Sequence, residues 1–231
     1  MLGVIVNTLT VIIGSLTGLF FKKNLPKKIT DSIMLGIGLC TICIGISGIV
    51  NIDNAIVLIV SVVLGAILGT ILDIDAKITN IGNYFSQKFK NTDENKSSIA
   101  EGFVTACLLF CVGSMTIVGS LNSGLSGDHT MIFTKSFLDL ISSTMLSASL
   151  GPGVLLASVF VFVFQGLLVL LSEFLAPLLT QAAISQINNV GSLLVFALGF
   201  NIIGVTKIKV SNYLPSIVFA PFILWIFNLV F

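Results

Sequence analysis

The chain has 231 residues, of which 55% are hydrophobic and only 9% are charged, and its formal net charge is +1. A soluble domain carries about 25% charged residues, so a chain this apolar cannot cover a large water-facing surface. The composition therefore excludes a separate soluble domain, and it offers no basic patch for nucleic acid. It predicts an all-α integral membrane protein, a polytopic helix bundle in the lipid bilayer with a single domain over residues 1–231.

Long apolar runs along the chain predict the membrane-crossing helices, because each crossing needs about 20 apolar residues. In chain order the runs are Leu2–Phe21, Ile29–Val50, Ala55–Leu72, Ile99–Leu121, Val154–Leu175, Ile184–Val205 and Leu214–Phe231. A further segment, Met131–Leu150, has the length of a crossing but carries Lys135, Asp139 and many hydroxyls. We therefore expect about eight membrane segments, with seven as the variant if Met131–Leu150 is broken or re-entrant.

The lysines predict how the chain is oriented in the membrane. All 11 basic residues are lysines, and most of them fall in the gaps Lys22–Lys28, Lys77–Lys96 and Lys207–Lys209. If residues 131–150 cross the membrane fully, the three gaps lie on the same side of it. The positive-inside rule predicts that this side is the cytoplasm. This arrangement predicts a multi-pass protein of the inner or plasma membrane with both termini outside.

The longest polar stretch is Asp73–Ser98, between the third and fourth apolar runs. Its apolar residues recur near helical spacing and alternate with charged ones, which is typical of an amphipathic helix on a membrane surface. The alternative is an ordinary loop helix packed on the protein. We expect a cytoplasmic amphipathic loop at residues 73–98.

Two Gly-x-x-x-Gly pairs, Gly14/Gly18 and Gly65/Gly69, lie within the first and third apolar runs. Lipid offers no hydrophobic drive between helices, so helices in a membrane pack closely through small residues. We interpret both pairs as packing surfaces within the chain, which leaves a homo-oligomer open.

Met131–Leu150 carries a polar stripe in helical register. Lys135 and Asp139 are four residues apart and can pair on one helix face. The stripe consists of Ser136, Asp139, Ser143 and Ser147, and the opposite face carries Phe133, Phe137, Ile141 and Leu150. Such a helix among apolar neighbours fits an interior position that lines a hydrophilic path. The alternative is a neutralised structural pair, with hydroxyls that bond back to their own helix.

The glycine-rich loop at residues 119–129 contains the only histidine, His129, together with hydroxyl, amide and carboxylate groups. It fits a vestibule or gate, and it fits a plain surface turn equally well. Gln165 lies in the middle of its apolar run and is the strongest isolated amide. The candidate pathway residues are Asn122, Asp128, Lys135, Asp139, Ser143, Gln165 and Asn201.

The sequence offers no catalytic constellation. It lacks a Gly-x-Ser-x-Gly elbow, a phosphate-binding loop and a His-Glu-x-x-His motif. The cysteine pairs Cys40/Cys43 and Cys107/Cys111 lie inside apolar runs, where small packing residues are a better interpretation than a thiolate metal site. We therefore expect no enzyme activity, no cofactor and no metal site.

The chain resembles a family of bacterial membrane proteins of unknown function, the YdfK/YqgA-like group. The stretches that carry the resemblance are Leu9–Gly18, Gly36–Gly48, Gly113–Leu121, Gly127–His129, Lys135–Asp139 and Lys207–Pro215. Pro152 departs from the family pattern and could stiffen the break after Leu150. The resemblance implies a multi-spanning inner-membrane protein, often described as a candidate transporter, without an established substrate.

We therefore expect a small secondary transporter or channel for a small polar solute or ion. In this hypothesis Asp139 binds or relays a cation or proton and Lys135 tunes it, although Lys135 could equally attract an anion. The alternatives are a non-transporting scaffold or sensor that acts through residues 73–98, and a lipid- or small-molecule-binding protein with a closed cavity.

Overall fold

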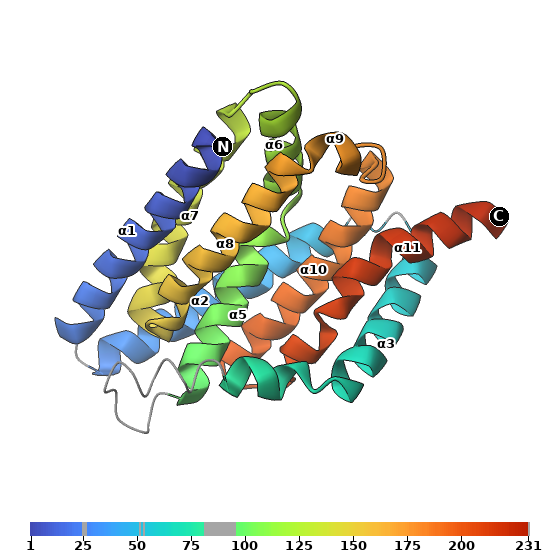
Figure 1. Ribbon diagram of the computed structural model, residues 1–231. Coiled ribbons are helices and arrows are strands. Elements are labelled where there is room, and N and C mark those ends of the chain that lie inside the picture. The colour runs from blue at the N-terminus through green and yellow to red at the C-terminus, as the bar shows by residue number, and fades with distance from the viewer. Residues whose placement is uncertain (25–26, 51, 53, 81–95, 231) are drawn as a thin grey trace. The chain divides into compact units, whose positions relative to one another are not determined.

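The computed structural model describes residues 1–24, 27–50, 52, 54–80 and 96–230, and this part of the chain is all-helical (Figure 1). Its contacts group into two compact units. The first unit contains residues 1–37 and 79–176, and the second contains residues 38–78 and 177–231. Helix α2 begins in the first unit and ends in the second. The expectation of a single membrane domain stays a prediction.

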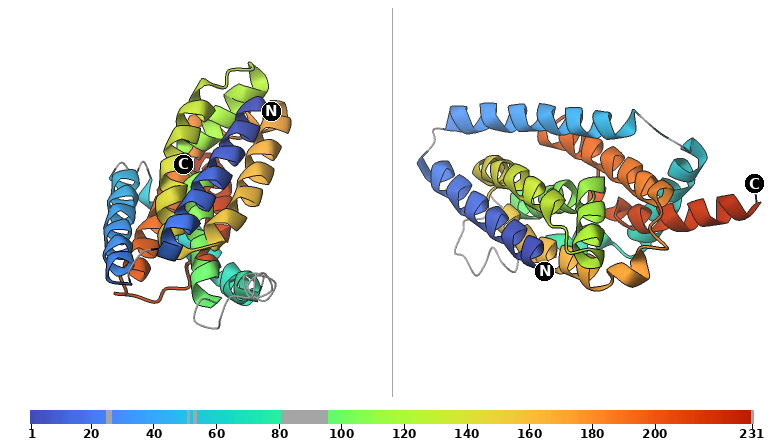
Figure 2. Two further views of the ribbon diagram at one scale, coloured as in Figure 1. Left: turned by 90° about the vertical axis from the view of Figure 1, so that its left-hand side faces the viewer. Right: turned by 90° about the horizontal axis from the view of Figure 1, so that it is seen from above.

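Helices α1, α7 and α8 form the centre of the first unit. Helix α1 runs alongside α7, and α8 packs against α1, α5 and α6 (Figures 1 and 2). The helices of this unit are α1 (Leu2–Asn24), the first part of α2 (Lys27–Ile49), α5 (Lys96–Cys111), α6 (Ser114–Leu125), α7 (Thr130–Leu150), α8 (Gly153–Leu170) and α9 (Ser172–Leu175). Their shared core includes Phe110, Leu146, Val154 and Val161, all at most 3% exposed.

The second unit is built around the packing of α3 against α11. Helix α10 packs against both of them, and its core contacts include Val57, Ala183 and Leu224. The elements of this unit are the rest of α2, α3 (Ala55–Ile71), α10 (Gln181–Ile202), the short helix η2 (Val210–Tyr213) and α11 (Pro215–Val230). Asn54 begins α3 as its N-cap, because its side chain accepts hydrogen bonds from the Ile56 and Val57 amides.

The glycine pairs lie where one helix closely approaches the backbone of another segment. A Cβ atom added at Gly14 would lie 2.5 Å from the carbonyl oxygen of Leu140, and one added at Gly18 would lie 2.9 Å from the amide nitrogen of Ala148. In the second unit, a Cβ atom at Gly69 would lie 2.6 Å from the carbonyl carbon of Asn212. Only a residue without a side chain permits these backbone contacts. The glycines therefore pack helices within the chain, as their spacing predicts.

The structure supports fewer membrane segments than eight. Within the described residues, four helices are long and apolar enough to cross a membrane, and up to six segments qualify if each of two bent helix pairs is one crossing. The two other segments of the predicted eight are α2 and α7, and their crossing stays a prediction. Helix α2 contributes a shorter apolar helix, Met34–Ile49, among the residues that the structure describes, and the charged side chains of Lys135 and Asp139 lower the mean hydropathy of α7.

The break falls in a different place from the one suggested by the sequence. The polar segment at residues 131–150 is one continuous helix, α7, of 21 residues. The apolar run Ile99–Leu121 is instead divided between α5 and α6, whose axes differ by 56°. Gly113 causes the division, because its extended backbone (φ −71°, ψ 142°) ends one helix and caps the next.

A second bend of 56° separates α3 from the helix at Ile74–Asn80. Asp73 lies at the bend with φ 46°, a left-handed conformation that aspartate tolerates better than most residues. The remainder of the predicted amphipathic loop, residues 81–95, lies outside the described residues. Its placement on a membrane surface therefore stays a prediction.

Candidate functional site

A buried ion pair on α7 is the centre of the candidate site. The Lys135 ammonium donates a hydrogen bond to Asp139 Oδ2 one helical turn away, as the spacing predicts. Both residues are only 5% exposed. The Lys135 Nζ atom also lies 5.6 Å from the centre of the Phe110 ring at the end of α5, a distance that allows a cation–π contact.

An amide pair from α1 and α8 completes this group. Asn7 Nδ2 donates a hydrogen bond of 3.1 Å to Gln165 Oε1, and both side chains are fully buried. The Asn7 side chain also lies near the Asp139 carboxylate. We call Asn7, Lys135, Asp139 and Gln165 the polar cluster. It joins α1, α7 and α8 in the interior of the first unit.

The polar cluster leaves part of its hydrogen-bonding capacity unused within the described residues. Asn7 Oδ1 and Gln165 Nε2 are both buried, and neither has a hydrogen-bond partner there. Leaving one buried donor or acceptor unsatisfied costs about 1–3 kcal/mol, so most proteins avoid it. A free acceptor and a free donor beside a charged pair are suited to the binding of a small polar guest.

The division between α5 and α6 lies next to the polar cluster. Phe110 and Cys111 form the end of α5, and Cys111 lies within electrostatic range of both Lys135 and Asp139. Thr116 Oγ1 donates a 2.8 Å hydrogen bond back to the Phe110 carbonyl, which fixes the start of α6 against the end of α5. Half-helices of this kind present free backbone groups and partial charges at membrane depth, and transporters use them to bind substrates.

The polar stripe of α7 faces the interior, as the sequence predicts. Ser136, Ser143 and Ser147 are buried, while Phe133, Phe137 and Ile141 are exposed on the opposite face. Leu150, assigned to the exposed face from its spacing, is buried. The serine hydroxyls bond to backbone carbonyls: Ser136 to Ile132, Ser143 to Leu140, and Ser147 to Gly151. These hydroxyls all have backbone partners, so we do not include them in the polar cluster, and a role for Ser143 along a pathway stays a prediction.

Asn122 and Asp128 lie at or near the connection between α6 and α7. Asn122 is half-buried in the last turn of α6. Asp128 is exposed, and its Oδ1 atom accepts a 2.9 Å hydrogen bond from the Thr130 amide, which holds the pKa of the carboxyl below its ordinary value. His129 Nδ1 is 2.8 Å from Ser123 Oγ in the same connection. These local bonds describe an ordered turn at the N-terminal end of α7.

Asn201 belongs to the second unit and has a local role there. Its Nδ2 atom donates to the Ile208 carbonyl (2.7 Å), and its Oδ1 atom accepts from the Ile208 amide (3.0 Å) and the Thr206 hydroxyl (2.7 Å). These bonds fix the segment after α10, so we do not include Asn201 in the polar cluster.

Asn201→Ala should loosen the segment at residues 205–209 without unfolding α10. Each lost hydrogen bond is worth about 0.5–1.5 kcal/mol, so faster amide hydrogen exchange at Ile208 is expected. Asn188→Ala, on the same helix, provides the matched control. Unchanged exchange at Ile208 would show that the segment is held by other contacts.

Sequence reasoning identified the charged pair and Gln165, but it did not identify the way they are joined. Asn7 is recognisable as an amide in the first apolar run, yet its partner lies 158 residues away. The break at Gly113 was missed as well, and its only sequence signal was a glycine inside an apolar run. Among the described residues, no three His, Cys, Asp or Glu side chains come together as metal ligands, and the four cysteines are free thiols.

Comparisons with known proteins place the chain among uncharacterised bacterial proteins. A family described as "Protein of unknown function (DUF554)" matches residues 2–225. The "Uncharacterized membrane protein YdfK" of Bacillus subtilis (strain 168) is 33% identical over 232 residues, with 99% of this chain and 97% of that protein covered. The "Uncharacterized protein YqgA" of Escherichia coli (strain K12) is 28% identical over 221 residues, with 95% and 94% covered. No solved structure matches the chain. These relatives confirm the resemblance drawn from the sequence.

Proposed function

Because the chain belongs to the DUF554 family, whose function is not established, we propose from its own geometry that it is a small secondary transporter or channel for a small polar solute or ion. The observation that carries the proposal is the polar cluster, buried between helices whose outer faces are apolar. We further propose a multi-pass protein of the inner membrane with its lysine-rich gaps in the cytoplasm.

Energetic cost supports a functional role for the cluster. A charged side chain at the centre of a membrane helix costs about 2.5–3.5 kcal/mol, and such residues usually mark a substrate or ion route. Mutual pairing lowers this cost for Lys135 and Asp139, but pairing alone does not account for the unused amide groups of Asn7 and Gln165. A solute that bonds to those groups would account for both features.

The proposed roles follow from the chemistry of each group. Asp139 exchanges its bond with Lys135 for one with a cation or proton, and Lys135 balances the charge when the site is empty. Gln165 Nε2 donates a hydrogen bond to the solute, and Asn7 Oδ1 accepts one from it. An anion would instead bind to Lys135 and the N-terminus of α6, where the helix dipole favours negative charge. Asn122 and Asp128 then lie at the entrance, at the N-terminal end of α7.

Flux measurements in proteoliposomes test the proposal. The protein is screened against labelled cations, anions and small polar metabolites, and Asp139→Asn is compared with Asp31→Asn, which changes an exposed carboxylate on α2. Asp139→Asn should reduce flux at least about tenfold, since it removes a charge at the site, whereas Asp31→Asn should match the wild type. Size-exclusion chromatography checks that both variants are folded.

The rival hypothesis is a scaffold or sensor that acts through residues 73–98. If Asp139→Asn and Lys135→Met both leave flux unchanged, while a deletion within residues 73–98 abolishes a cellular phenotype, the rival hypothesis replaces transport. If the deletion has no effect and Asp139→Asn stops flux, the transport proposal stands.

A further inference from the structure

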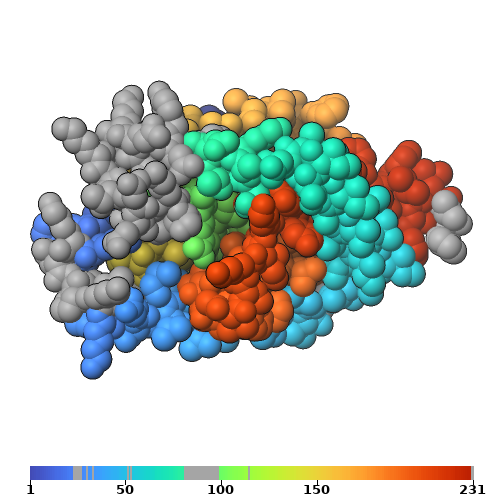
Figure 3. Space-filling view, turned by 90° about the horizontal axis from the view of Figure 1, so that it is seen from below, coloured from blue at the N-terminus to red at the C-terminus, as the bar shows by residue number. Residues whose placement is uncertain are grey.

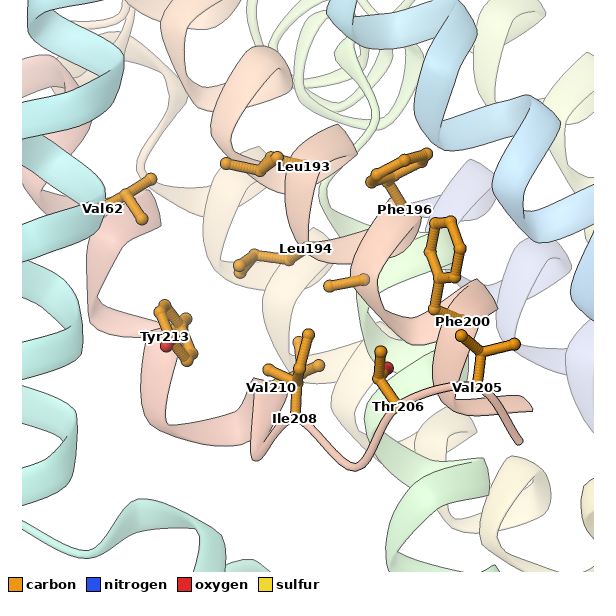
Figure 4. A pocket seen from close by; sticks show the side chains of 11 residues that line it. Val62, Leu193, Leu194, Phe196, Phe200, Val205, Thr206, Ile208, Val210 and Tyr213 are labelled. Carbon is orange, nitrogen blue, oxygen red and sulfur yellow. The ribbon is translucent and has the colours of Figure 1, made fainter. Parts of the chain in front are cut away.

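The second unit contains an apolar pocket of about 430 Å³ beside α10 (Figure 4). Leu194, Phe196 and Phe200 point into it from α10, and Val62 closes it from α3. Tyr213 supplies an aromatic wall. The volume lies within the range of about 300–1,000 Å³ that is usual for small-molecule sites. An almost entirely apolar lining excludes a small polar solute as the occupant.

One wall of the pocket is formed by residues 206–210, in which lining residues alternate with exposed lysines. Thr206, Ile208 and Val210 line the pocket, whereas Lys207 and Lys209 between them are exposed. The two exposed lysines therefore alternate along the chain with residues that line the cavity, and their long side chains are free to reach an anionic group at its rim. Figure 3 shows this orange-red segment at the surface of the molecule, next to the end of α3.

The segment at the edge of the pocket is held in place by hydrogen bonds. The Asn201 side chain accepts hydrogen bonds from the Thr206 hydroxyl and the Ile208 amide and donates one to the Ile208 carbonyl, so it holds the residues on both sides of Lys207. Gly204, with φ 79°, makes the turn from α10 into this segment. The backbone that carries the lysines is therefore held by the end of α10, the helix that also supplies five of the eleven lining residues.

We propose that this pocket binds a phospholipid with an anionic headgroup. An acyl chain fills the apolar cavity, and the phosphate lies against the ammonium groups of Lys207 and Lys209. Cytoplasmic leaflets are rich in anionic lipids, and basic groups beside an apolar cavity at the membrane surface are typical of sites that hold them. The lysine-rich gaps are predicted to lie on that same side. The site belongs to the second unit and does not depend on the transport proposal.

Native mass spectrometry of the full-length protein in detergent tests this site. Titration with dioleoyl-phosphatidylglycerol should give clearly tighter binding than titration with dioleoyl-phosphatidylcholine, which has the same acyl chains. K207Q/K209Q should weaken phosphatidylglycerol binding about thirty-fold, converted from about 1 kcal/mol for each lysine near an anionic surface. K28Q, an exposed lysine on α2, is the matched control and should bind normally.

A second variant tests the cavity itself. Ala197→Phe places a large ring in the pocket, and it should reduce the binding of both lipids at least about tenfold. K207Q/K209Q changes only exposed side chains, so it remains informative if Ala197→Phe does not fold. Equal binding of the two lipids, or normal phosphatidylglycerol binding by K207Q/K209Q, would overturn the proposal. Displacement of the lipid by millimolar inorganic phosphate alone, or binding of a peptide in its place, would overturn it too.

Discussion

Lys135→Met is expected to lower the free energy of unfolding by about 3–5 kcal/mol, because it leaves the Asp139 carboxylate buried without its counter-charge. Asp139 is only 5% exposed, and Asn7 is an uncharged neighbour that cannot replace the ammonium. The measurement is the apparent Tm in detergent together with unfolding in denaturant. Lys28→Met, which removes an exposed ammonium from α2, should leave both unchanged.

The double variant Lys135→Met/Asp139→Leu separates a structural role from a functional one. Replacing both partners of a buried ion pair with apolar residues is often neutral or stabilising by about 1–4 kcal/mol, so the double variant should recover the stability lost in Lys135→Met. It should nevertheless have no flux, because the charged groups of the site are gone. A stable double variant with full flux would show that the pair only holds α7 together.

Gly18→Val is expected to separate α1 from α7 and to lower stability by about 3 kcal/mol or more. A Cβ atom at this position would lie 2.9 Å from both the Ala148 amide nitrogen and the Ser147 Cβ atom. Backbone atoms of a packed helix cannot move aside as the end of a flexible side chain can, so overpacking here falls at the upper end of its usual cost. Thermal unfolding in detergent measures the loss.

Gly36→Ala is the matched control for Gly18→Val. A Cβ atom at Gly36 on α2 would meet nothing within 4 Å, and alanine favours a helix over glycine by about 0.5–1 kcal/mol. Its Tm should therefore be equal to or higher than that of the wild type. Equal losses at Gly18 and Gly36 would mean that the close approach of α1 and α7 is not needed for stability. Because α1 carries Asn7, Gly18→Val should also break the Asn7–Gln165 bond and reduce flux.

Local sequence patterns predicted those features of the fold that depend on one helix. The spacing of Lys135 and Asp139 predicted their pairing, and the period of the serines predicted which face of α7 is buried. Both follow from the geometry of a single α-helix, which is the same in any environment. The glycine pairs likewise predicted close helix packing, because few other residues permit it.

Features that depend on distant parts of the chain could not be predicted in this way. Hydropathy averages over a window, so it counted α5 and α6 as one crossing and did not register the break at Gly113. The bond between Asn7 and Gln165 needs knowledge of how α1 and α8 pack. Asn201 looks identical in sequence to an amide that lines a path, and only its bonds to Thr206 and Ile208 show a local role.

Neither compact unit is a continuous stretch of sequence, because each is assembled from two pieces. Residues 38–78 of the second unit separate the two pieces of the first, and residues 79–176 of the first unit separate the two pieces of the second. During synthesis, α1 therefore leaves the ribosome long before its packing partners α7 and α8 are made. In the same way, α3 is made long before its partner α11. Contacts between segments so far apart in the sequence form late. A prematurely terminated chain that ends after residue 176 would hold both pieces of the first unit but only one of the two pieces of the second.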